Sequence, residues 1–246
     1  MKKNVLFFFF FLMVAGYALT GQAQSYASLD REAQNVPAMY EQNKKTLVKY
    51  LMSFAKNDTE KARILAAWIV FNVDENKFKS SREKKETNRG RAAPVISSGD
   101  TFISRIGNSD DFAELYQELG ELAGLQVAVI QGYAGYNVSG RNYLQNKHTW
   151  NAVKIDGQWH LLDIDWAMKG TSFGANMRNL ALYEEEVERR GDLSYSLSRR
   201  GRSNKSFDGR WFFTNPYTMI KTHIPLQESW QLLPVPKNFS FTKQGS

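Results

Sequence analysis

The segment between positions 148 and 165, HTWNAVKIDGQWHLLDID, restricts the fold more than any other part of the chain. Two runs rich in apolar residues flank Asp156-Gly157. This dipeptide favours a two-residue hairpin turn because both residues adopt positive φ readily. Such a turn pairs Ile155 with Gln158. The sequence therefore predicts an antiparallel β-hairpin with Asp156 and Gly157 at its tip.

Continuing this register outward places Trp150 opposite Asp163 and His148 opposite Asp165. Side chains alternate between the two faces of a sheet, so His148, Asp163 and Asp165 are predicted to share one face. Asp163 is then diagonal to His148, with the two backbones about 7–8 Å apart and the side chains within reach. The hairpin is expected to hold an imidazole beside carboxylates.

A histidine beside an aspartate has two interpretations. In one, Asp163 fixes the tautomer of His148, and the other ring nitrogen serves as a general base. In the other, the pair is a hydrogen bond that supports the structure only. Trp150 and Trp166 flank the pair and are either core side chains or, with Asp165, part of a ligand cleft.

Three further segments carry a helical pattern of apolar residues. Residues 43–55 come first, and residues 57–73 follow as an amphipathic helix in which Asn57 and Glu60 are typical of a capping box. The third helix is predicted over 109–124, with an apolar face of Phe112, Leu115, Tyr116, Leu119, Leu122 and Ala123. A strand over 125–134 comes next. This order indicates an α+β fold with N-terminal helices packed on an antiparallel sheet.

The first 23 residues are typical of a secretory signal peptide. A basic start, an apolar run from Val5 to about Ala15 and small residues before Ala23 predict cleavage near Ala23, which leaves residues 24–246 as one domain of a secreted or periplasmic protein. A short membrane anchor is the alternative, but the run is shorter than the ~20 residues of a spanning helix. The chain has no cysteine, which excludes disulfides, a thiol nucleophile and thiolate zinc sites.

Basic residues outnumber acidic ones, and the formal net charge is +7. Much of the excess lies in residues 77–91 and 189–205, the second within a basic insertion at about 170–210. Both segments are expected to be solvated surface, with contact to a polyanion as the alternative. Neither interleaves aromatic residues with its charges, so no specific nucleic-acid binding is expected.

Four segments of the chain resemble the transglutaminase-like superfamily. EKARILAAWIVFNV is similar to the tryptophan-containing helix of that family, RIGNSDDFAELYQELGELAGLQVAVIQGYA to its nucleophile helix and next strand, and KHTWNAVKIDGQWHLLDIDW to its histidine–aspartate hairpin. The tail FFTNPYTMIKTHIPLQESWQLL resembles the branch related to the kyphoscoliosis peptidase and to cytokinesis proteins. The resemblance extends from about Tyr26 to Leu233 and implies a papain-like fold.

The family implies acyl transfer by a cysteine at the start of its nucleophile helix, with a histidine as base and an aspartate that orients it. Carried onto this chain, the base is His148, the orienting residue is Asp163, and the nucleophile position is Ser109. Two further positions depart from the family pattern. Asp111 stands where glycine is usual, and Asp165 stands where threonine is common.

The serine admits two functions. With the His–Asp pair, Ser109 would form the triad of a peptidase or amidase, but a hydroxyl needs a closely placed base and an oxyanion hole. Asp110 and Asp111 in the first helical turn oppose a developing oxyanion, whereas Asn108 or Ser109 is suited to be the helix N-cap. The favoured hypothesis is a catalytically silent domain that binds a peptide or a cell-envelope polymer.

No metal or cofactor is expected from the sequence. His148, His160 and His223 lack the spacing of a ligand set, and His160 is predicted to lie on the opposite hairpin face from His148. Asp110 and Asp111 lack the alternating oxygen ligands of a calcium loop. No phosphate loop or dinucleotide fingerprint is present.

Overall fold

The computed structural model describes residues 26–75, 101–135, 147–168 and 205–239. The predicted leader, the basic segment 77–91 and nearly all of the predicted insertion lie outside these ranges. Within the described ranges, no helix is both long enough and apolar enough to cross a membrane.

Helices dominate the first half of the fold. A helical segment covers residues 26–34. The further helical elements are η1 (Ala38–Tyr40), α2 (Lys44–Met52), α3 (Asp58–Asn72), α5 (Thr101–Ser104), α6 (Ser109–Leu122), α7 (Ile164–Met168), η4 (Gly209–Trp211), α10 (Pro216–Met219) and η5 (Glu228–Gln231). The three helices predicted from the sequence correspond to α2, α3 and α6.

The second half builds one antiparallel sheet. Its strands are β3 (Gln126–Ala134), β4 (Lys147–Ile155), β5 (Gln158–Leu162), β6 (Phe212–Thr214) and β7 (His223–Pro225). They lie in the order β6-β5-β4-β3-β7. Two short strands, β1 (Asp74–Glu75) and β2 (Ile106–Gly107), pair in parallel apart from this sheet.

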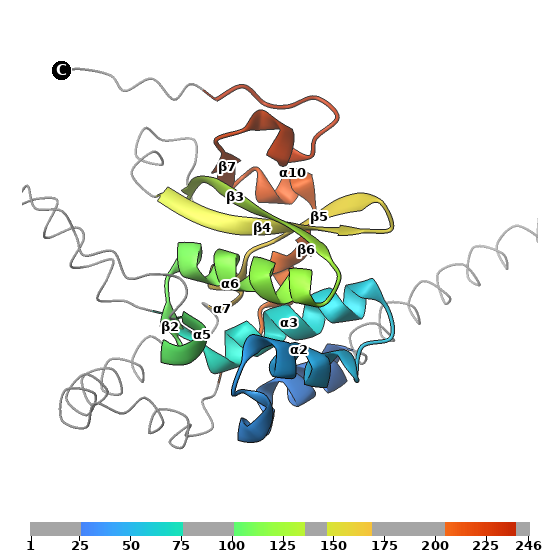
Figure 1. Cartoon of the computed structure of the whole chain (residues 1–246). Coiled ribbons are helices and arrows are strands. Elements are labelled where there is room, and N and C mark those ends of the chain that lie inside the picture. The colour runs from blue at the N-terminus through green and yellow to red at the C-terminus, as the bar shows by residue number, and fades with distance from the viewer. Residues whose placement is uncertain (1–25, 76–100, 136–146, 169–204, 240–246) are drawn as a thin grey trace, which may run out of the picture.

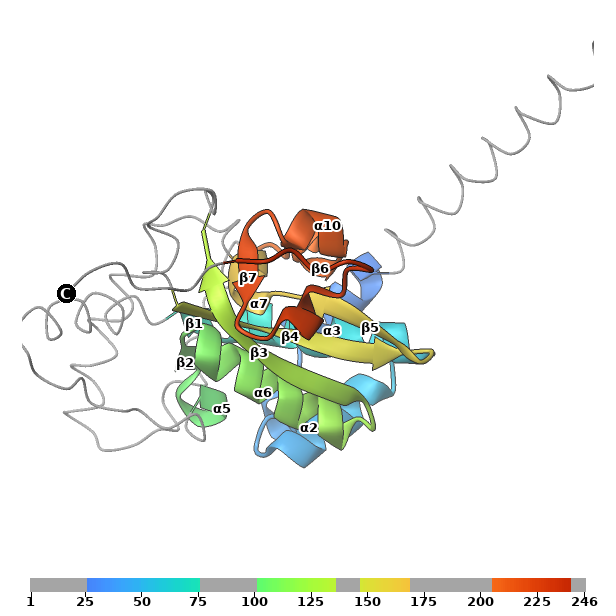
Figure 2. The same cartoon turned by 90° about the horizontal axis from the view of Figure 1, so that it is seen from above.

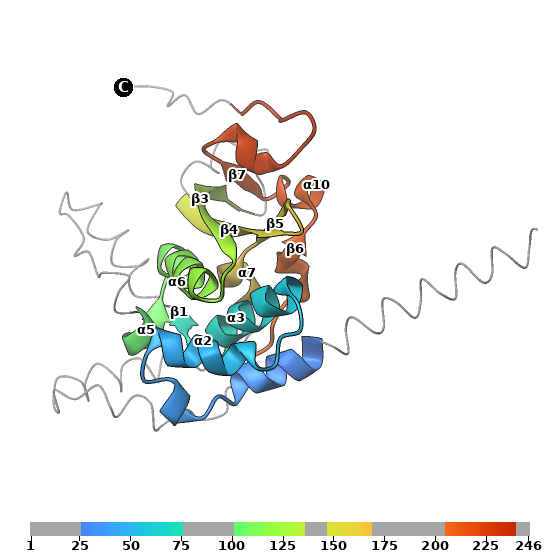
Figure 3. The same cartoon turned by 45° about the vertical axis from the view of Figure 1, so that its right-hand side comes forward.

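The elements form layers, as Figures 1 and 3 show. Helix α6 lies under the sheet, and α3 and α2 lie under α6. Seen from above in Figure 2, α10 and η5 lie over the opposite face of the sheet. The predicted fold class, helices packed on an antiparallel sheet, is therefore confirmed.

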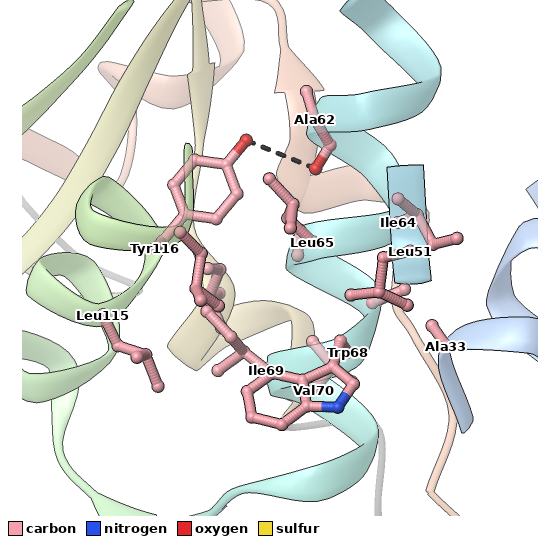
Figure 4. Close-up of a cluster of buried hydrophobic side chains, with 14 of the residues drawn as sticks. Ala33, Leu51, Ala62, Ile64, Leu65, Trp68, Ile69, Val70, Leu115 and Tyr116 are labelled. Carbon is pink, nitrogen blue, oxygen red and sulfur yellow. Dashed lines mark hydrogen bonds between the residues drawn. The ribbon is translucent and has the colours of Figure 1, made fainter. Parts of the chain in front are cut away.

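Helix α3 forms the centre of the core rather than an amphipathic surface helix. Every residue from Ala62 to Val70 is buried, because the helix lies between α2 and α6. Figure 4 shows this contact, in which the hydroxyl of Tyr116 donates to the carbonyl oxygen of Ala62 at 3.3 Å. The expected apolar face of α6 is buried except at its end, where Leu122 is 43% exposed and Ala123, the C-cap, is partly buried.

The predicted start of α3 is confirmed in part. The side chain of Asn57 is the N-cap and accepts from the backbone N–H of Glu60 at 2.9 Å. The carboxylate of Glu60, however, accepts from the N–H of Lys56 instead of that of Asn57. The capping box predicted at this position therefore does not close.

The predicted hairpin turn is present, but its ladder is shorter than expected. Ile155 pairs with Gln158, and Asp156 and Gly157 have φ values of 49° and 80°. The pairing stops at Asn151 and Leu162. The predicted pairs of Trp150 with Asp163 and of His148 with Asp165 are wrong, because the chain leaves the sheet after Leu162 and enters α7.

Candidate active site

His148 and Asp163 meet in the interior of the domain. Nε2 of His148 lies 2.7 Å from Oδ2 of Asp163, and the two side chains are 8% and 1% exposed. Asp163 is the residue immediately before α7. Its Oδ1 accepts the backbone N–H of Trp166 at 3.0 Å and so caps that helix, while its other oxygen faces the ring. His148 and Asp163 are therefore neighbours, but Asp163 lies just before α7 and not at the diagonal strand position that the register predicted.

His223 completes this cluster and was missed in the sequence analysis. Its Nε2 lies 2.8 Å from the same Oδ2 of Asp163, and its Nδ1 lies 2.8 Å from the hydroxyl oxygen of Thr222. The histidine arrives on β7, where it pairs with Ala134 of β3. The segment THIP in the family-like tail was the available signal, but no local register links it to Asp163, 60 positions earlier.

Aromatic rings enclose His223. Its ring centroid lies 4.6 Å from that of Trp166, 5.1 Å from that of Trp150 and 5.4 Å from that of Trp211. Trp150 and Trp166 are 1% and 5% exposed, and Asp165 is 6% exposed. The residues proposed for a ligand cleft are therefore buried around the His–Asp cluster, and neither tryptophan presents an open ring face to a ligand.

Gly132 makes room for this arrangement. It pairs with His148 on one side and with Pro225 on the other. A Cβ at this position would lie 2.6 Å from Cη2 of Trp150 and would also collide with the carbonyl oxygen of Ile224. Only a residue without a side chain lets the indole lie across β3 at this point.

The buried Asp163 is held in its ionised form. Burial alone raises the pKa of this carboxyl, but the charge and hydrogen bond of His148 and the hydrogen bond of His223 outweigh it and hold the pKa well below its usual range. Because an ionised carboxylate only accepts hydrogen bonds, both Nε2 atoms carry a hydrogen. The nitrogen of His148 left for base chemistry is therefore Nδ1.

A second carboxylate faces that nitrogen. Oδ2 of Asp165 lies 3.8 Å from Nδ1 of His148. The imidazole is thus placed between Asp163 on one side and Asp165 on the other. Oδ2 of Asp165 therefore lies on the side of the ring from which a nucleophile would have to approach Nδ1.

Ser109 is the first residue of α6 and not its cap. Asn108 is the N-cap, with Oδ1 accepting from the N–H of Asp111 at 3.1 Å while Oδ2 of Asp111 accepts from the N–H of Asn108 at 2.9 Å. The idea that Ser109 itself caps the helix is wrong. Throughout the described ranges no hydrogen bond joins Ser109 to His148, so the structure assembles the His–Asp pair but not a bonded triad.

The neighbours of these two residues are joined instead. The hydroxyl of Thr149 donates to Oδ1 of Asp110, which ties the strand position after His148 to the helix position after Ser109. Both carboxylates in the first turn of α6 therefore accept a hydrogen bond, Asp110 from Thr149 and Asp111 from the backbone of Asn108. The helix start carries two carboxylates where an oxyanion would have to develop.

His148, Asp163 and His223 also offer ligand atoms that lie within 4.8 Å of one another, the one such group among the described residues. One carboxylate oxygen accepts from both rings at 2.7 and 2.8 Å, which are hydrogen-bond distances. Zinc with these ligands holds its donor atoms about 2.0 Å away and needs Nε2 without a hydrogen. As arranged, the three side chains satisfy one another and do not fit a metal.

The fold and the buried His–Asp pair define a papain-like α+β domain. Residues 45–164 match the model of the transglutaminase-like superfamily. The chain therefore contains a transglutaminase-like domain over these residues.

Individual proteins are also similar to this chain. The chain is similar to the kyphoscoliosis peptidase of Mus musculus, with 26% identity over 216 residues, 87% of this chain and 27% of that protein. It is 28% identical over 217 residues to hillarin of Drosophila melanogaster, covering 86% of this chain and 23% of that one. It thus spans about a quarter of the length of these relatives. A solved TGase structure is similar with a TM-score of 0.34 and 14% identity, covering 49% of this chain and 31% of that chain.

Proposed function

We propose that the chain is an exported, catalytically silent transglutaminase-like domain that binds a peptide or a cell-envelope polymer without acyl chemistry. One observation carries this proposal: the ring nitrogen of His148 that a nucleophile needs faces the carboxylate of Asp165, and Ser109 makes no hydrogen bond to the ring. Export rests on the leader predicted over residues 1–23.

The chemical argument concerns the proton that serine must lose. Nδ1 of His148 would have to accept it as the hydroxyl attacks. Oδ2 of Asp165 lies 3.8 Å from that nitrogen, on the side from which the hydroxyl would have to approach. A cysteine thiol loses its proton more readily than a hydroxyl and depends less on a closely placed base. The same geometry is therefore a smaller obstacle to a cysteine than to Ser109.

Binding at this site would take place at the start of α6. Asp110 is exposed there and Ser109 is partly exposed, whereas the histidines and tryptophans behind them are buried. A partner would then contact the exposed helix start and leave the cluster around Asp163 unchanged.

A secreted serine peptidase or amidase is the second candidate. The 2.7 Å hydrogen bond between His148 and Asp163 favours it, because the same pair orients the base in serine triads. The two candidates differ in whether Ser109 is a nucleophile.

Fluorophosphonate labelling separates these candidates. The wild-type protein is compared with Ser109→Ala and His148→Ala, and Ser104→Ala serves as a control at a partly buried serine five positions upstream. A silent domain stays unlabelled while circular dichroism shows that it is folded. Labelling that maps to Ser109 and disappears in both site variants but not in the control would establish the peptidase and overturn the proposal.

A further inference from the structure

A cavity of about 610 Å³ is lined by residues other than those of the His–Asp cluster. Its walls come from the helical segment 26–34, the start of α3, the β4–β5 turn and β6. Ile155 lines it at one end of β4, and His148 stands at the other end of that strand, roughly 23 Å away for seven residues of extended chain. The volume is in the range of small-ligand sites.

Arg63 is a fixed cationic group in the cavity wall. It is 5% exposed. Its Nε and Nη2 donate to the two carboxylate oxygens of Asp30 at 2.8 and 2.6 Å, and its guanidinium carbon lies 3.5 Å from the ring centroid of Phe207. The guanidinium has five N–H donors, and Nη1 donates to no group in the part of the chain that the structure describes. Arg63 therefore retains donors for a ligand.

His160 is a second polar side chain in the cavity wall. Its ring is half-buried and stacks on Phe213 with centroids 4.6 Å apart, and it lines the cavity. Within the described ranges neither ring nitrogen makes a hydrogen bond. The predicted orientation is confirmed, because His160 pairs with Val153 and so faces away from His148.

The backbone beside His160 is strained. Phe213 has a φ of 54°, a left-handed conformation that is an outlier for a bulky residue. The pairing of β5 with β6 also shifts register between Leu161 and Leu162. Strain and bulges concentrate at functional sites, where they direct side chains toward a ligand. Here they bring the ring of Phe213 against His160 in the cavity wall.

Acidic side chains also line the cavity and a hollow beside it. Asp156, at the hairpin tip, lines both this cavity and an adjoining hollow that also contains Asp58 and Glu60. Asp30 is already neutralised by Arg63. The cavity thus offers hydrogen-bond donors at Arg63 and a carboxylate at Asp156.

We propose that this cavity binds a small zwitterion, a free amino acid or a dipeptide, whose carboxylate is held by Arg63 and His160 and whose ammonium group faces Asp156. Apolar lining by Ile155, Phe212 and Phe213 accommodates the ligand's side chains. The site is independent of the proposed binding at α6.

Calorimetric titration of the full protein with alanyl-phenylalanine tests the proposal. N-acetyl-alanyl-phenylalanine lacks the ammonium group, and alanyl-phenylalanine amide lacks the carboxylate. Asp156→Asn keeps the positive-φ turn that asparagine tolerates and removes the charge, and His160→Gln removes the imidazole. Lys154→Gln, a nearby change outside the lining, is the matched control.

The dipeptide is expected to bind the wild type and the control equally. Asp156→Asn, His160→Gln and either blocked ligand should each weaken binding by roughly tenfold, as loss of one charge-assisted hydrogen bond does. The acetylated ligand has no ammonium group, so its affinity for Asp156→Asn should equal its affinity for the wild type. Equal binding of all three ligands, insensitivity to both variants, or no binding at millimolar concentration would overturn the proposal. None of these outcomes bears on labelling at Ser109.

Discussion

Nδ1 of His148 faces Oδ2 of Asp165 across 3.8 Å. Because Asp163 accepts from the other ring nitrogen at 2.7 Å, the imidazole is bracketed by carboxylates on both sides. The ring donates through Nε2 to Asp163 in the interior, which gives the cluster a structural role. The stability of the domain should therefore depend on it even without catalysis.

Replacing Asp163 with asparagine should destabilise the domain strongly. Two imidazole N–H groups lose their shared charged acceptor in the interior, and breaking a buried pair of this kind costs about 3–5 kcal/mol. Urea unfolding followed by tryptophan fluorescence measures the change. Asp208→Asn is the control, since its partner Arg210 is 83% exposed and such pairs contribute about 0–1 kcal/mol. Similar losses in both variants would contradict the structural role.

The same carboxyl should make the domain sensitive to acid. Its pKa is lowered in the fold and is about 3.9 in an unfolded chain. Its contribution is then fully present above about pH 4 and is lost as the pH falls below that value, where the unfolded state binds the proton first. Urea midpoints measured from neutral to acidic pH should fall more steeply for the wild type than for Asp163→Asn. Parallel curves would show that another group controls the acid transition.

His223→Phe isolates the hydrogen bond from the packing of the ring. Phenylalanine fills the space between the tryptophans but cannot donate to Asp163, so we expect a loss of about 1–3 kcal/mol. His160→Phe should change the free energy of unfolding by less, because His160 makes no hydrogen bond within the described ranges and its stacking on Phe213 is retained. The reverse order of the two effects would be evidence against the shared carboxylate.

Gly132→Ala tests the close approach of Trp150 to β3. The added Cβ would lie 2.6 Å from Cη2 of the indole, and overpacking of this kind costs about 1–3 kcal/mol. The near-ultraviolet circular dichroism of the tryptophans should change as well. Gly209→Ala is a matched control, because nothing lies within 4 Å of a Cβ built there.

Tyr116→Phe should alter stability at high pH. Burial raises the pKa of Tyr116 far above its usual range, so its contribution is present below about pH 10 and is lost as the pH rises, when the unfolded state releases its proton first. The variant should lose about 0.5–1.5 kcal/mol at neutral pH with the hydrogen bond to Ala62. Above pH ~10 the gap between wild type and variant should narrow, as thermal unfolding across pH would show.

Local sequence patterns predicted the elements whose cause is local. The hairpin tip follows from the φ preferences of Asp156 and Gly157, and α2 and α6 follow from helical periodicity with asparagine caps. The proximity of His148 to Asp163 was also predictable, because the turn at Asp156-Gly157 folds the chain back and brings the residue just after β5 beside the first half of β4.

Features that depend on distant segments could not be predicted from those patterns. The position of His223 depends on β7 pairing with β3 across a long stretch of chain, and no periodicity records that pairing. The all-round burial of α3 likewise arises from helices on several sides. The predicted strand pairing fails after Leu162 because Asp163 is not a strand residue: its side chain caps α7.

The carboxylate of Asp163 joins three parts of the polypeptide. Its Oδ1 caps α7, and its Oδ2 accepts hydrogen bonds from His148 on β4 and from His223 on β7. Folding alone therefore accounts for this carboxylate and both histidines, whether or not Ser109 reacts. An intact histidine–aspartate pair in such a domain is a feature of its architecture and not by itself a sign of reactivity.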